Sequence, residues 1–596
     1  MAARTWIHLA VGIALALAGL LLDPHWLKAA LDARAADGRT DFFSLEVVSG
    51  LRWALVLAGP CVALWPALAR VLARAPRAEP AGGRGAPLVE TLLVAALLLC
   101  GLARIRSGPP LTKDTRFYLG ESLDMAEHGG LAALPGRLLR GEHTDANRHP
   151  LYPGLLSLAA EESDRFVERA RLLSLLGGAA ALVALVRLCR RAWGEGGAAL
   201  SGALLVTNGA FLEASVTVGC ESWWMACAIL WFDLLTREEQ GRPLRRAAAA
   251  GACVGLAYLF KGTASLLLVL TVAHLALTLR RRALASLGAA LGAFALVALP
   301  LLWRNATVFG NPLYNVNSSR VFWLDEWREF YDPAAMSAAG PLSYLADHSA
   351  LDVVARLAAG AVKQGVNLLE DLAPLAPHAG LGLPLLVLVA ACALRDPSRR
   401  RRGLLAALFA LFFAVFAWYA QVVSGARFLA VIVPLLFVPV AALWPRLFGP
   451  RRARACAGTV ALVVAAWAVA DGALAWRPGR FRPAPGAEVV RAYLATVAGL
   501  DGDQVHYLLG PNDDLTFDWD RDLRGTRHPF PPTRAGLERL LASRDGALIR
   551  YALVRDPARS PRQGAGATWF AAPPAGWTPL ERLEVGDEEV RVLRRD

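Results

Sequence analysis

Residues 247–303 read AAAAGACVGLAYLFKGTASLLLVLTVAHLALTLRRRALASLGAALGAFALVALPLLW, three apolar runs separated by Lys261-Gly262 and by Arg280 to Arg282. Each run has roughly 14–20 residues without an acid, lysine or arginine, close to the length that crosses a bilayer as a helix. In lipid only helices and closed barrels satisfy their own backbone hydrogen bonds. Barrel strands alternate apolar and polar residues, so these continuous runs predict membrane helices.

The same pattern extends over most of the chain. Of its 596 residues, 55% are hydrophobic and 19% are charged, and the mean hydropathy is +0.40. Soluble proteins have about 45–50% apolar and 25% charged residues, so a soluble enzyme, a fibrous protein and a disordered chain are excluded. The sequence predicts a polytopic α-helical membrane protein with about 13 transmembrane helices, at 6–22, 51–73, 87–104, 169–187, 198–216, 221–236, 247–261, 263–279, 284–303, 381–394, 404–423, 428–445 and 456–475.

The basic residues orient these helices. The net charge of +13 raises nucleic acid as a partner, but the arginines gather in short loops after every second predicted helix, as at Arg280–Arg282 and Arg399–Arg402. By the positive-inside rule these loops are cytoplasmic. We therefore expect a multi-pass protein of the cell (inner) membrane, with a cytoplasmic N-terminus and an extracytoplasmic tail. Helix 6–22 could instead be a signal peptide, but its apolar run continues through Leu20–Leu22, which favours an anchor.

We expect three parts along the chain. An N-terminal pair of helices occupies residues 1–86, a transmembrane module with outer loops 105–168 and 304–380 occupies 87–475, and an extracytoplasmic domain occupies 477–596. In the second outer loop, Ala350 to Leu372 shows helical spacing and is predicted to lie along the membrane surface. In the tail, a helix at 488–497 and strands at 506–509 and 547–554 predict a small α/β domain. No CxxC, P-loop or GxGxxG motif indicates a zinc or nucleotide site.

Two segments of the first outer loop carry chemistry-bearing residues. Lys113-Asp114-Thr115-Arg116-Phe117-Tyr118 follows the third predicted helix, and Arg148-His149-Pro150-Leu151-Tyr152-Pro153 comes farther on. At the membrane interface, poor solvation raises the pKa of an aspartate, whereas neighbouring cations such as Lys113 and Arg116 lower it. Such a carboxylate can act as a general base on a membrane-bound substrate. An ordinary loop aspartate is the alternative.

An acid and a lysine lie at other outer helix ends. Glu221 begins the sixth predicted helix, where the helix dipole alone also favours an acid, and Trp223 and Trp224 beside it suit interfacial anchors. Lys261 lies in an almost uncharged turn and is one of only four lysines. A lone lysine at that depth is costly unless it meets an anion such as a phosphate, or else extends to the surface.

Two arginines lie at the outer ends of later helices. Arg304-Asn305 is followed by Phe309-Gly310-Asn311-Pro312-Leu313-Tyr314, and Arg427 follows Gly425-Ala426. A guanidinium there can bind a phosphate through two parallel hydrogen bonds. Alternatively Arg304 caps backbone carbonyls at a turn made by Gly310-Asn311-Pro312.

In this order the motifs resemble those of the GT-C membrane glycosyltransferases, and most of all the protein-mannosyltransferase and aminoarabinose-transferase group. Asp114 and Tyr118 match the first and last positions of that group's Asp-Glu-x-x-Tyr, from which Thr115 departs. His149–Pro153 is similar to its Arg-Pro-Pro-Leu-Tyr-Pro, and Lys261-Gly262 to its Leu-x-x-Lys-Gly. The most specific match is Arg304–Pro312, which looks like Arg-Asn-x-x-x-Phe-Gly-Asn-Pro. The resemblance covers about residues 87–475.

The resemblance implies a GT-C-like fold and a transferase that moves a sugar, with inversion, from a polyprenyl-phosphate donor to a glycan, lipid or protein acceptor on the outer face. The implied catalytic residues are Asp114 and Glu221. The implied donor-phosphate ligands are Lys261, Arg304 and Arg427, and the implied substrate-binding residues are Lys113, Tyr118, His149, Tyr152 and Asn305. A divalent metal shared by the two acids and the phosphate stays open, although the sequence shows no strong ligand cluster.

Two other function classes compete with this interpretation. A transporter or flippase of a lipid-linked glycan would carry charges near the middle of the membrane and often internal repeats. Here the charged candidates lie at helix ends and no repeat is visible, so the transferase is favoured. The second is a binding or sensing protein that acts through its tail domain.

Overall fold

The structure is a computed structural model of the 596-residue chain. It describes residues 2–32, 45–73, 86–106, 113–143, 145–161, 164–237, 242–279, 283–326, 329–330, 333–373, 379–423, 427–448, 450–475, 506–509, 526–529, 541, 549–555, 569, 572–585 and 588–595. The chain divides into two compact units, one of Met1–Val316 with Ala350–Arg477 and one of Asn317–Ser349 with Pro478–Asp596.

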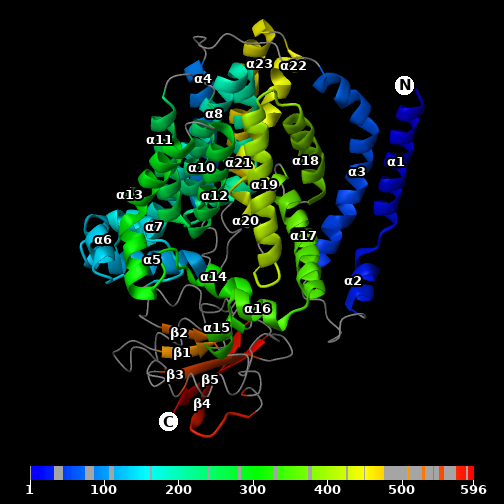
Figure 1. Ribbon diagram of the computed structural model, residues 1–596. Coiled ribbons are helices and arrows are strands. Elements are labelled where there is room, and N and C mark those ends of the chain that lie inside the picture. Colours follow the sequence, from blue (N-terminus) through cyan, green and yellow to red (C-terminus); the bar gives the residue numbers. More distant parts are fainter. Residues whose placement is uncertain are drawn as a thin grey trace. The chain divides into compact units, whose positions relative to one another are not determined.

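The first unit is a bundle of helices whose positions follow the predicted apolar runs (Figure 1). Its apolar helices are α1 (Ala2–Leu21), α3 (Leu45–Leu72), α4 (Ala86–Arg106), α8 (Asp164–Val206), α9 (Gly209–Val216), α10 (Glu221–Thr236), α11 (Pro243–Phe260), α12 (Ser265–Leu279), α13 (Ala283–Phe309), α18 (Ala379–Leu394), α19 (Arg399–Tyr419), α21 (Val433–Val440) and α23 (Pro450–Ala475). Short elements between them are α2 (Pro24–Asp32), η2 (Gly262–Ala264), α20 (Arg427–Ala430), η6 (Ala441–Leu443) and α22 (Trp444–Leu447).

Not all of these helices are long enough to span a membrane by themselves. Among the described residues, five helices have the length and composition of a membrane span, or up to seven if each of two bent pairs counts as one, and four further apolar helices are shorter. Helix α8 is broken at Gly194, where φ is 79° and ψ is −172°. This break falls between the two predicted helices 169–187 and 198–216. The predicted number of about 13 spans stays a prediction.

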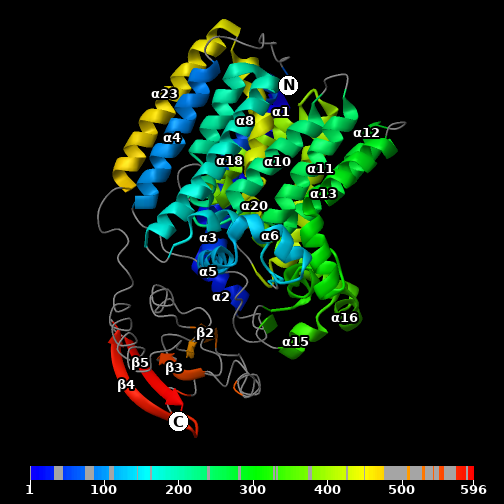
Figure 2. The same cartoon turned by 90° about the vertical axis from the view of Figure 1, so that its left-hand side faces the viewer.

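Close helix contacts hold the bundle together. Helices α4 and α23 pack side by side (Figure 2), and Arg104 of α4 pairs with Asp471 of α23 at 3.1 Å. Helices α1 and α3 pack together at one edge (Figure 1). There a Cβ added to Gly12 would lie 2.5 Å from the Gly59 carbonyl oxygen. Glycine at this crossing is therefore required for the approach of the two backbones, as at many membrane helix pairs.

The outer loop 105–168 contains short helices rather than irregular chain. These are α5 (Lys113–Glu127), α6 (Gly130–Leu139), α7 (Leu151–Leu156) and η1 (Ser157–Ala159), and they lie together at one end of the bundle (Figure 1). A core of Tyr118, Tyr152, Phe166 and Cys220 packs this layer onto α8 and the start of α10. The layer is therefore fixed to the helices that carry Glu221 and Lys261.

The predicted helix 350–372 is confirmed as α17 (Ala350–Leu372), which packs against α3, α18 and α19. Its polar side chains Arg356, Gln364 and Asp371 are buried, whereas Leu351 and Val354 are exposed. The N-terminal half of α17 therefore turns Arg356 inward and apolar side chains outward, whereas its C-terminal half buries apolar side chains such as Val366 and Leu369.

The second unit contains short helices and a sheet. Its helices are α14 (Val316–Ser319), η4 (Val321–Trp323), α15 (Pro333–Ala338) and α16 (Pro341–Asp347). Strands β1 (His506–Leu509), β2 (Thr526–Pro529), β3 (Ile549–Arg555), β4 (Trp577–Val585) and β5 (Glu588–Arg595) form one sheet in the order β2-β1-β3-β5-β4. Strand β1 is parallel to β2 and β3, and β5 is antiparallel to β3 and β4. Both predicted strands are confirmed, while the predicted helix 488–497 lies outside the described residues.

Candidate active site

A sharp bend between α9 and α10 forms the centre of the candidate site. The two helices meet at 118°, and the connecting residues 217–220 are held from several sides. Gly219 N–H donates to the Tyr152 hydroxyl at 3.0 Å, and that hydroxyl is 2.7 Å from Ser174 Oγ. Thr115 Oγ1 donates to the Val218 carbonyl at 3.4 Å. Helices α5, α7 and α8 therefore fix the turn that immediately precedes Glu221.

Glu221 and Lys261 form an ion pair across this turn. Lys261 Nζ lies 2.8 Å from Glu221 Oε1, with 22% and 17% of the two side chains exposed. The other carboxylate oxygen, Oε2, folds back over Gly219, where a Cβ would approach it to 2.5 Å. Lys261, for which the sequence shows no neighbouring anion, thus meets a carboxylate at the start of the preceding helix α10. Because both groups keep partial solvent access, a substrate anion can still approach Lys261.

Asp114 lies in the first turn of α5 and is half-buried. The pKa of the Tyr118 hydroxyl is raised well above its usual value, mainly by burial and then by Cys220, Glu221 and Asp114. Tyr118 Oη lies 3.3 Å from Cys220 Sγ, and its ring packs edge-on against Tyr152. The charges of Asp114 and Glu221 therefore act on the same buried phenol, and the structure brings the two acids into one neighbourhood.

Tyr152 gives a test of how the turn is held. Tyr152→Phe removes the shorter of two hydroxyl contacts to the buried Gly219 N–H and leaves it with Ser174 Oγ at 3.5 Å. This loss should lower the free energy of unfolding by about 0.5–1.5 kcal/mol. Because the turn positions Glu221, the transfer rate should fall as well. Thermal unfolding and a transfer assay measure both effects.

Tyr314→Phe is the matched control, since within the described part of the chain the Tyr314 hydroxyl makes no hydrogen bond, while its ring stacks on Phe309. Equal stability of both variants would show that the Tyr152 hydroxyl does not hold the turn.

His149 connects the Lys261-Gly262 turn to the outer loops. It is buried, its ring packs edge-on against Tyr258 at 4.8 Å, and a Cβ on Gly262 would lie 2.7 Å from its Nε2. Asn315 Nδ2 lies 3.5 Å from the same nitrogen. Burial, and then the charge of Arg304, lowers the pKa of His149 to about 4. His149 is therefore a neutral ring that packs behind the turn.

Arg304 and Asn305 organise the backbone around them. Arg304 is only 2% exposed and donates from Nη1 to the Asp145 carbonyl at 2.7 Å, with its guanidinium 5.3 Å from the Phe309 ring centroid. Asn305 Nδ2 donates to the Pro312 and Tyr314 carbonyls, each at 3.1 Å. These contacts match the capping alternative for Arg304. A role of Arg304 as a phosphate ligand stays a prediction and requires this buried group to become accessible.

A second acid on α5, Glu121, was missed by the sequence analysis. Its Oε1 lies 3.2 Å from His143 Nε2, and both side chains are largely buried. Residues 114, 118 and 121 follow the i, i+4, i+7 spacing of one helix face, and this spacing is the signal that could have identified Glu121. Burial lowers the pKa of His143 to about 4, so this ring too is neutral at pH 7.

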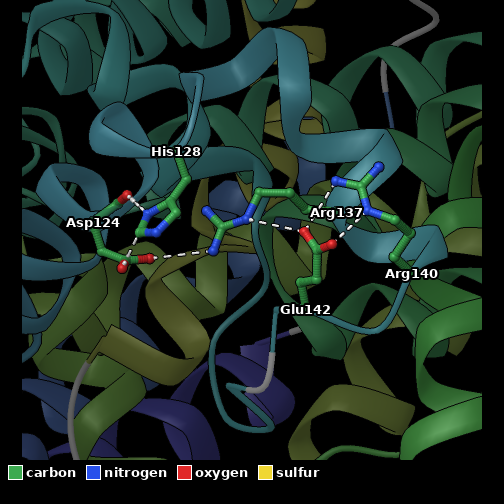
Figure 3. A network of polar contacts seen from close by, with 5 residues as sticks. All are labelled: Asp124, His128, Arg137, Arg140 and Glu142. Carbon is green, nitrogen blue, oxygen red and sulfur yellow. Dashed lines mark hydrogen bonds and ion pairs between the residues drawn. The ribbon is translucent and has the colours of Figure 1, made fainter.

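The segment that carries His143 is fixed by a polar network (Figure 3). Asp124 of α5 contacts His128 at 3.4 Å and Arg137 of α6 at 3.5 Å. Arg137 then lies 4.0 Å from Glu142, which also pairs with Arg140. The network ties the end of α5 to α6 and to the chain that leads into His143. It thereby holds the Glu121–His143 pair together.

Glu121 predicts a pH dependence of stability. Its pKa is raised to about 8, mainly by burial and then by Asp145, while Arg148 lowers it, Asp124 raises it and Arg304 lowers it. Because the pKa of Glu121 is higher in the folded state, the contribution of its protonated carboxyl to the free energy of unfolding is fully present below the usual pKa of 4.5. This contribution is lost as the pH rises toward 8. The glutamine of Glu121→Gln stays neutral at every pH. The free energy of unfolding of this variant, relative to that of wild type, should therefore rise by at most about 1.4 kcal/mol per pH unit between pH 4.5 and 8.

Thermal unfolding at pH 5 and pH 8 measures this difference. Glu127→Gln, at an exposed position on the same helix, is the control and should show no such trend. If the difference in thermal midpoint between wild type and Glu121→Gln is the same at pH 5 and pH 8, Glu121 is not protonated in the folded protein.

The structure gives less information on Lys113, Arg427 and a possible metal. Lys113 begins α5 and Arg427 begins α20, but their side chains lie outside the described part of the structure. Within the described residues, no group of three or more acidic, histidine or cysteine side chains is placed to hold a metal ion.

The chain was compared with protein families and with solved structures. Residues 150–303 match the family model described as dolichyl-phosphate-mannose-protein mannosyltransferase. That segment contains Tyr152, Glu221 and Lys261 but neither Asp114 nor Arg304. No curated protein matches the chain.

Two solved structures align with most of this chain. ArnT from Cupriavidus metallidurans bound to undecaprenyl phosphate is 13% identical with a TM-score of 0.52, over 86% of this chain and 98% of that one. An Archaeoglobus fulgidus oligosaccharyltransferase in complex with Zn and sulfate is 13% identical with a TM-score of 0.49, over 80% and 69% of the two chains. The predicted resemblance to GT-C membrane glycosyltransferases is thus confirmed, and the chain has a GT-C-like helical fold with a small C-terminal sheet region.

Proposed function

We propose that this protein is a membrane glycosyltransferase that moves a sugar from a polyprenyl-phosphate donor to an acceptor on the outer face of the membrane. The observation that carries the proposal is the Glu221–Lys261 ion pair at one end of a GT-C-like bundle, with Asp114 near enough for its charge and that of Glu221 to act on the same Tyr118 hydroxyl. A carboxylate beside a carboxylate–ammonium pair offers a proton acceptor and an anion ligand together. Support also comes from ArnT, which was crystallised with undecaprenyl phosphate.

The reaction is a displacement at the anomeric carbon of the sugar. An acceptor nucleophile attacks this carbon, the bond to the phosphate oxygen breaks, and its electron pair leaves with the polyprenyl phosphate. Asp114 takes the proton of the acceptor, and such general-base assistance is typically worth about 10²–10⁴ in rate. Attack from the side opposite the phosphate inverts the anomeric centre.

Lys261 is assigned to the leaving phosphate. Its ammonium carries three donors, of which Glu221 uses one at 2.8 Å. Charge develops on the phosphate oxygen as the bond breaks, so a fixed ammonium stabilises the transition state more than the ground state. Glu221 orients the lysine, and the half-buried position of both limits competition from water.

Most of the other predicted site residues hold the backbone of the site in place. Tyr118 and Tyr152 fix the 217–220 turn, and His149 packs behind the Lys261-Gly262 turn. Asn305 and Arg304 hold the start of the second outer loop. Arg427 remains assigned to the donor phosphate, and Lys113 to substrate binding, from the sequence motifs.

A divalent metal fits this arrangement poorly. Metal binding by Asp114 and Glu221 would place a divalent cation near the Lys261 ammonium, which lies 2.8 Å from Glu221 Oε1. Like charges at such distances repel. Lys261 already supplies the positive charge that a metal would bring to the phosphate, so the proposed steps use side chains alone.

The proposed outer-face location rests on the distribution of arginines, from which the outer loops and the tail are each predicted to lie outside the cytoplasm. A reporter active only outside the cytoplasm, fused after Asp596, should be active. Activity of a cytoplasmic reporter at this position would put Asp114 on the wrong side for an outer-face acceptor.

A flippase of a lipid-linked glycan is the second candidate, since it would use the same donor lipid. Mass spectrometry of envelope glycans, with and without the protein, separates the two functions in cells when Asp114→Asn is included. The transferase predicts that a sugar disappears from its acceptor in both the deletion and the Asp114→Asn strain. A flippase predicts that Asp114→Asn still supports the modification.

A further inference from the structure

The contact between Glu121 and His143 joins α5 to the segment 145–149, which follows His143 in the chain. Glu121 Oε1 and His143 Nε2 lie 3.2 Å apart, with 13% and 5% of the two side chains exposed. Among the described residues, neither atom has a hydrogen-bond partner elsewhere, and Glu121 Oε2 has none at all. Buried polar atoms are nearly always hydrogen-bonded, so each of these two side chains depends on the other.

A contact of this kind requires a proton between the two atoms. A carboxylate oxygen and an unprotonated ring nitrogen are both acceptors, and two acceptors that face each other at this distance repel. A protonated carboxyl can donate to Nε2 or accept from it, so it fits either tautomer of His143. An ionised carboxyl can only accept, and it would be a poorly solvated charge.

Charged groups from three elements and the connecting segment surround the pair. Asp124 and Arg137 lie on one side of it and contact each other at 3.5 Å (Figure 3). The full set consists of Asp124 of α5, Arg137 of α6, Asp145 and Arg148 of the segment, and Arg304 of α13.

Asp145 already engages the two arginines nearest to Glu121. Arg148 Nη1 lies 3.2 Å from Asp145 Oδ2, and Arg304 Nη1 donates to the Asp145 carbonyl at 2.7 Å. An ionised Glu121 would repel the Asp145 carboxylate and compete with it for both arginines. Ionisation of Glu121 therefore works against the contacts that hold the start of the segment.

The segment passes this position on to the turn that carries Lys261. Asp145 Oδ1 accepts from the backbone N–H groups of Asn147 and Arg148 at 2.6 and 3.0 Å. The Asn147 carbonyl accepts from Asn315 Nδ2 at 3.0 Å. His149 ends the segment, and its Nε2 lies where a Cβ on Gly262 would approach it to 2.7 Å. A shift of the segment would therefore reach the Lys261-Gly262 turn.

We propose that Glu121 is a positioning residue of sugar transfer, which in its protonated form holds His143 and the segment 145–149 against α5 and thereby fixes the Lys261 turn. Its ionisation loosens the segment and slows transfer at alkaline pH. The effect on transfer rests on the proposed function, whereas the effect on the segment does not.

The first test is the pH profile of transfer by the purified full-length protein in detergent. The pKa of Glu121 is about 8, so its protonated fraction, and with it the transfer rate of wild type, should fall roughly tenfold between about pH 7 and pH 9. Glu121→Gln should match wild type at about pH 7 and stay flat over this range, because an amide both donates and accepts and does not titrate.

Two variants serve as controls. Glu127→Gln, at an exposed position on the same helix, should keep the profile of wild type. Glu121→Met removes the partner of His143 and should be slower at every pH, without the alkaline decline. Other groups also titrate at alkaline pH, so the difference between wild type and Glu121→Gln carries the test. The same alkaline decline in both proteins would overturn the positioning role.

Two further measurements do not depend on transfer. Infrared difference spectra of wild type and Glu121→Gln should show the carbonyl band of a protonated carboxyl in wild type at neutral pH, and its absence would refute a protonated Glu121. Amide hydrogen exchange in peptides that cover 145–149 should be equal in the two proteins at about pH 7 and faster in wild type at about pH 9. Equal exchange at both pH values would show that Glu121 does not hold the segment.

These measurements separate the inference from the proposed function. A wild-type protein that gives the infrared and exchange signals but transfers no sugar at any pH would refute the proposed function, while it would confirm that Glu121 holds the segment.

Discussion

The Asp114→Asn protein is expected to bind its lipid-linked donor normally but to transfer sugar roughly 10²–10⁴-fold more slowly than wild type. Asparagine keeps the size of the side chain and its place in the first turn of α5, but it cannot accept the acceptor proton. Single-turnover transfer with saturating donor and acceptor measures the chemical step. Donor affinity, measured separately, should stay within a few fold because Asp114 acts on the acceptor.

Asp124→Asn is the matched control for Asp114→Asn. It is the same substitution on the same helix, at an exposed position that contacts His128 and Arg137. Transfer by this variant should stay close to wild type. A fully active Asp114→Asn enzyme would remove Asp114 as the base, and equal losses in both variants would indicate a defect of α5 as a whole.

The second large effect is expected from Lys261→Met. This change removes the proposed phosphate ligand and leaves Glu221 without its partner at 2.8 Å. Removal of one electrostatic group at a reacting centre typically costs about 10²–10³ in kcat, and we expect a loss of this size in kcat/KM for the donor. Glu221→Gln should cost less, because the lysine keeps its charge.

The double variant Lys261→Met/Glu221→Gln separates two roles of the lysine. If Lys261 only neutralised Glu221, loss of both charges together would restore much of the activity, since no unpaired charge would remain. If Lys261 holds the leaving phosphate, the double variant stays as impaired as Lys261→Met. We expect the second result, with thermal midpoints as the check that all three variants fold.

The helical framework could be predicted because it follows from local properties of the sequence. Runs such as 284–303 must form helices in lipid, and α17 was located by the spacing of its apolar residues alone. The face that α17 buries could not be predicted in this way, since Arg356 and Gln364 point into the protein. Helices α5, α6 and α7 were also missed, because short helices depend on packing against their neighbours more than on their own sequence.

For the candidate site, the sequence indicates residues but not the contacts between them. Lys261 was expected to require an anion, and its pairing with Glu221, 40 residues away in sequence, is a tertiary contact that no local pattern contains. Arg304 was assigned to the donor phosphate, whereas the structure shows it bound to the Asp145 carbonyl. Glu121 was overlooked because its partner His143 comes from a different segment of the loop.

The most direct test of the proposed function is the release of polyprenyl phosphate by the purified protein. The protein in detergent is given a polyprenyl-phosphate sugar with a labelled sugar and a crude envelope acceptor fraction, and both products are counted. The account predicts one polyprenyl phosphate released for each sugar transferred to the acceptor, with both products lost in Asp114→Asn. Intact donor after many hours, or its movement across proteoliposomes without bond cleavage, would contradict a transferase.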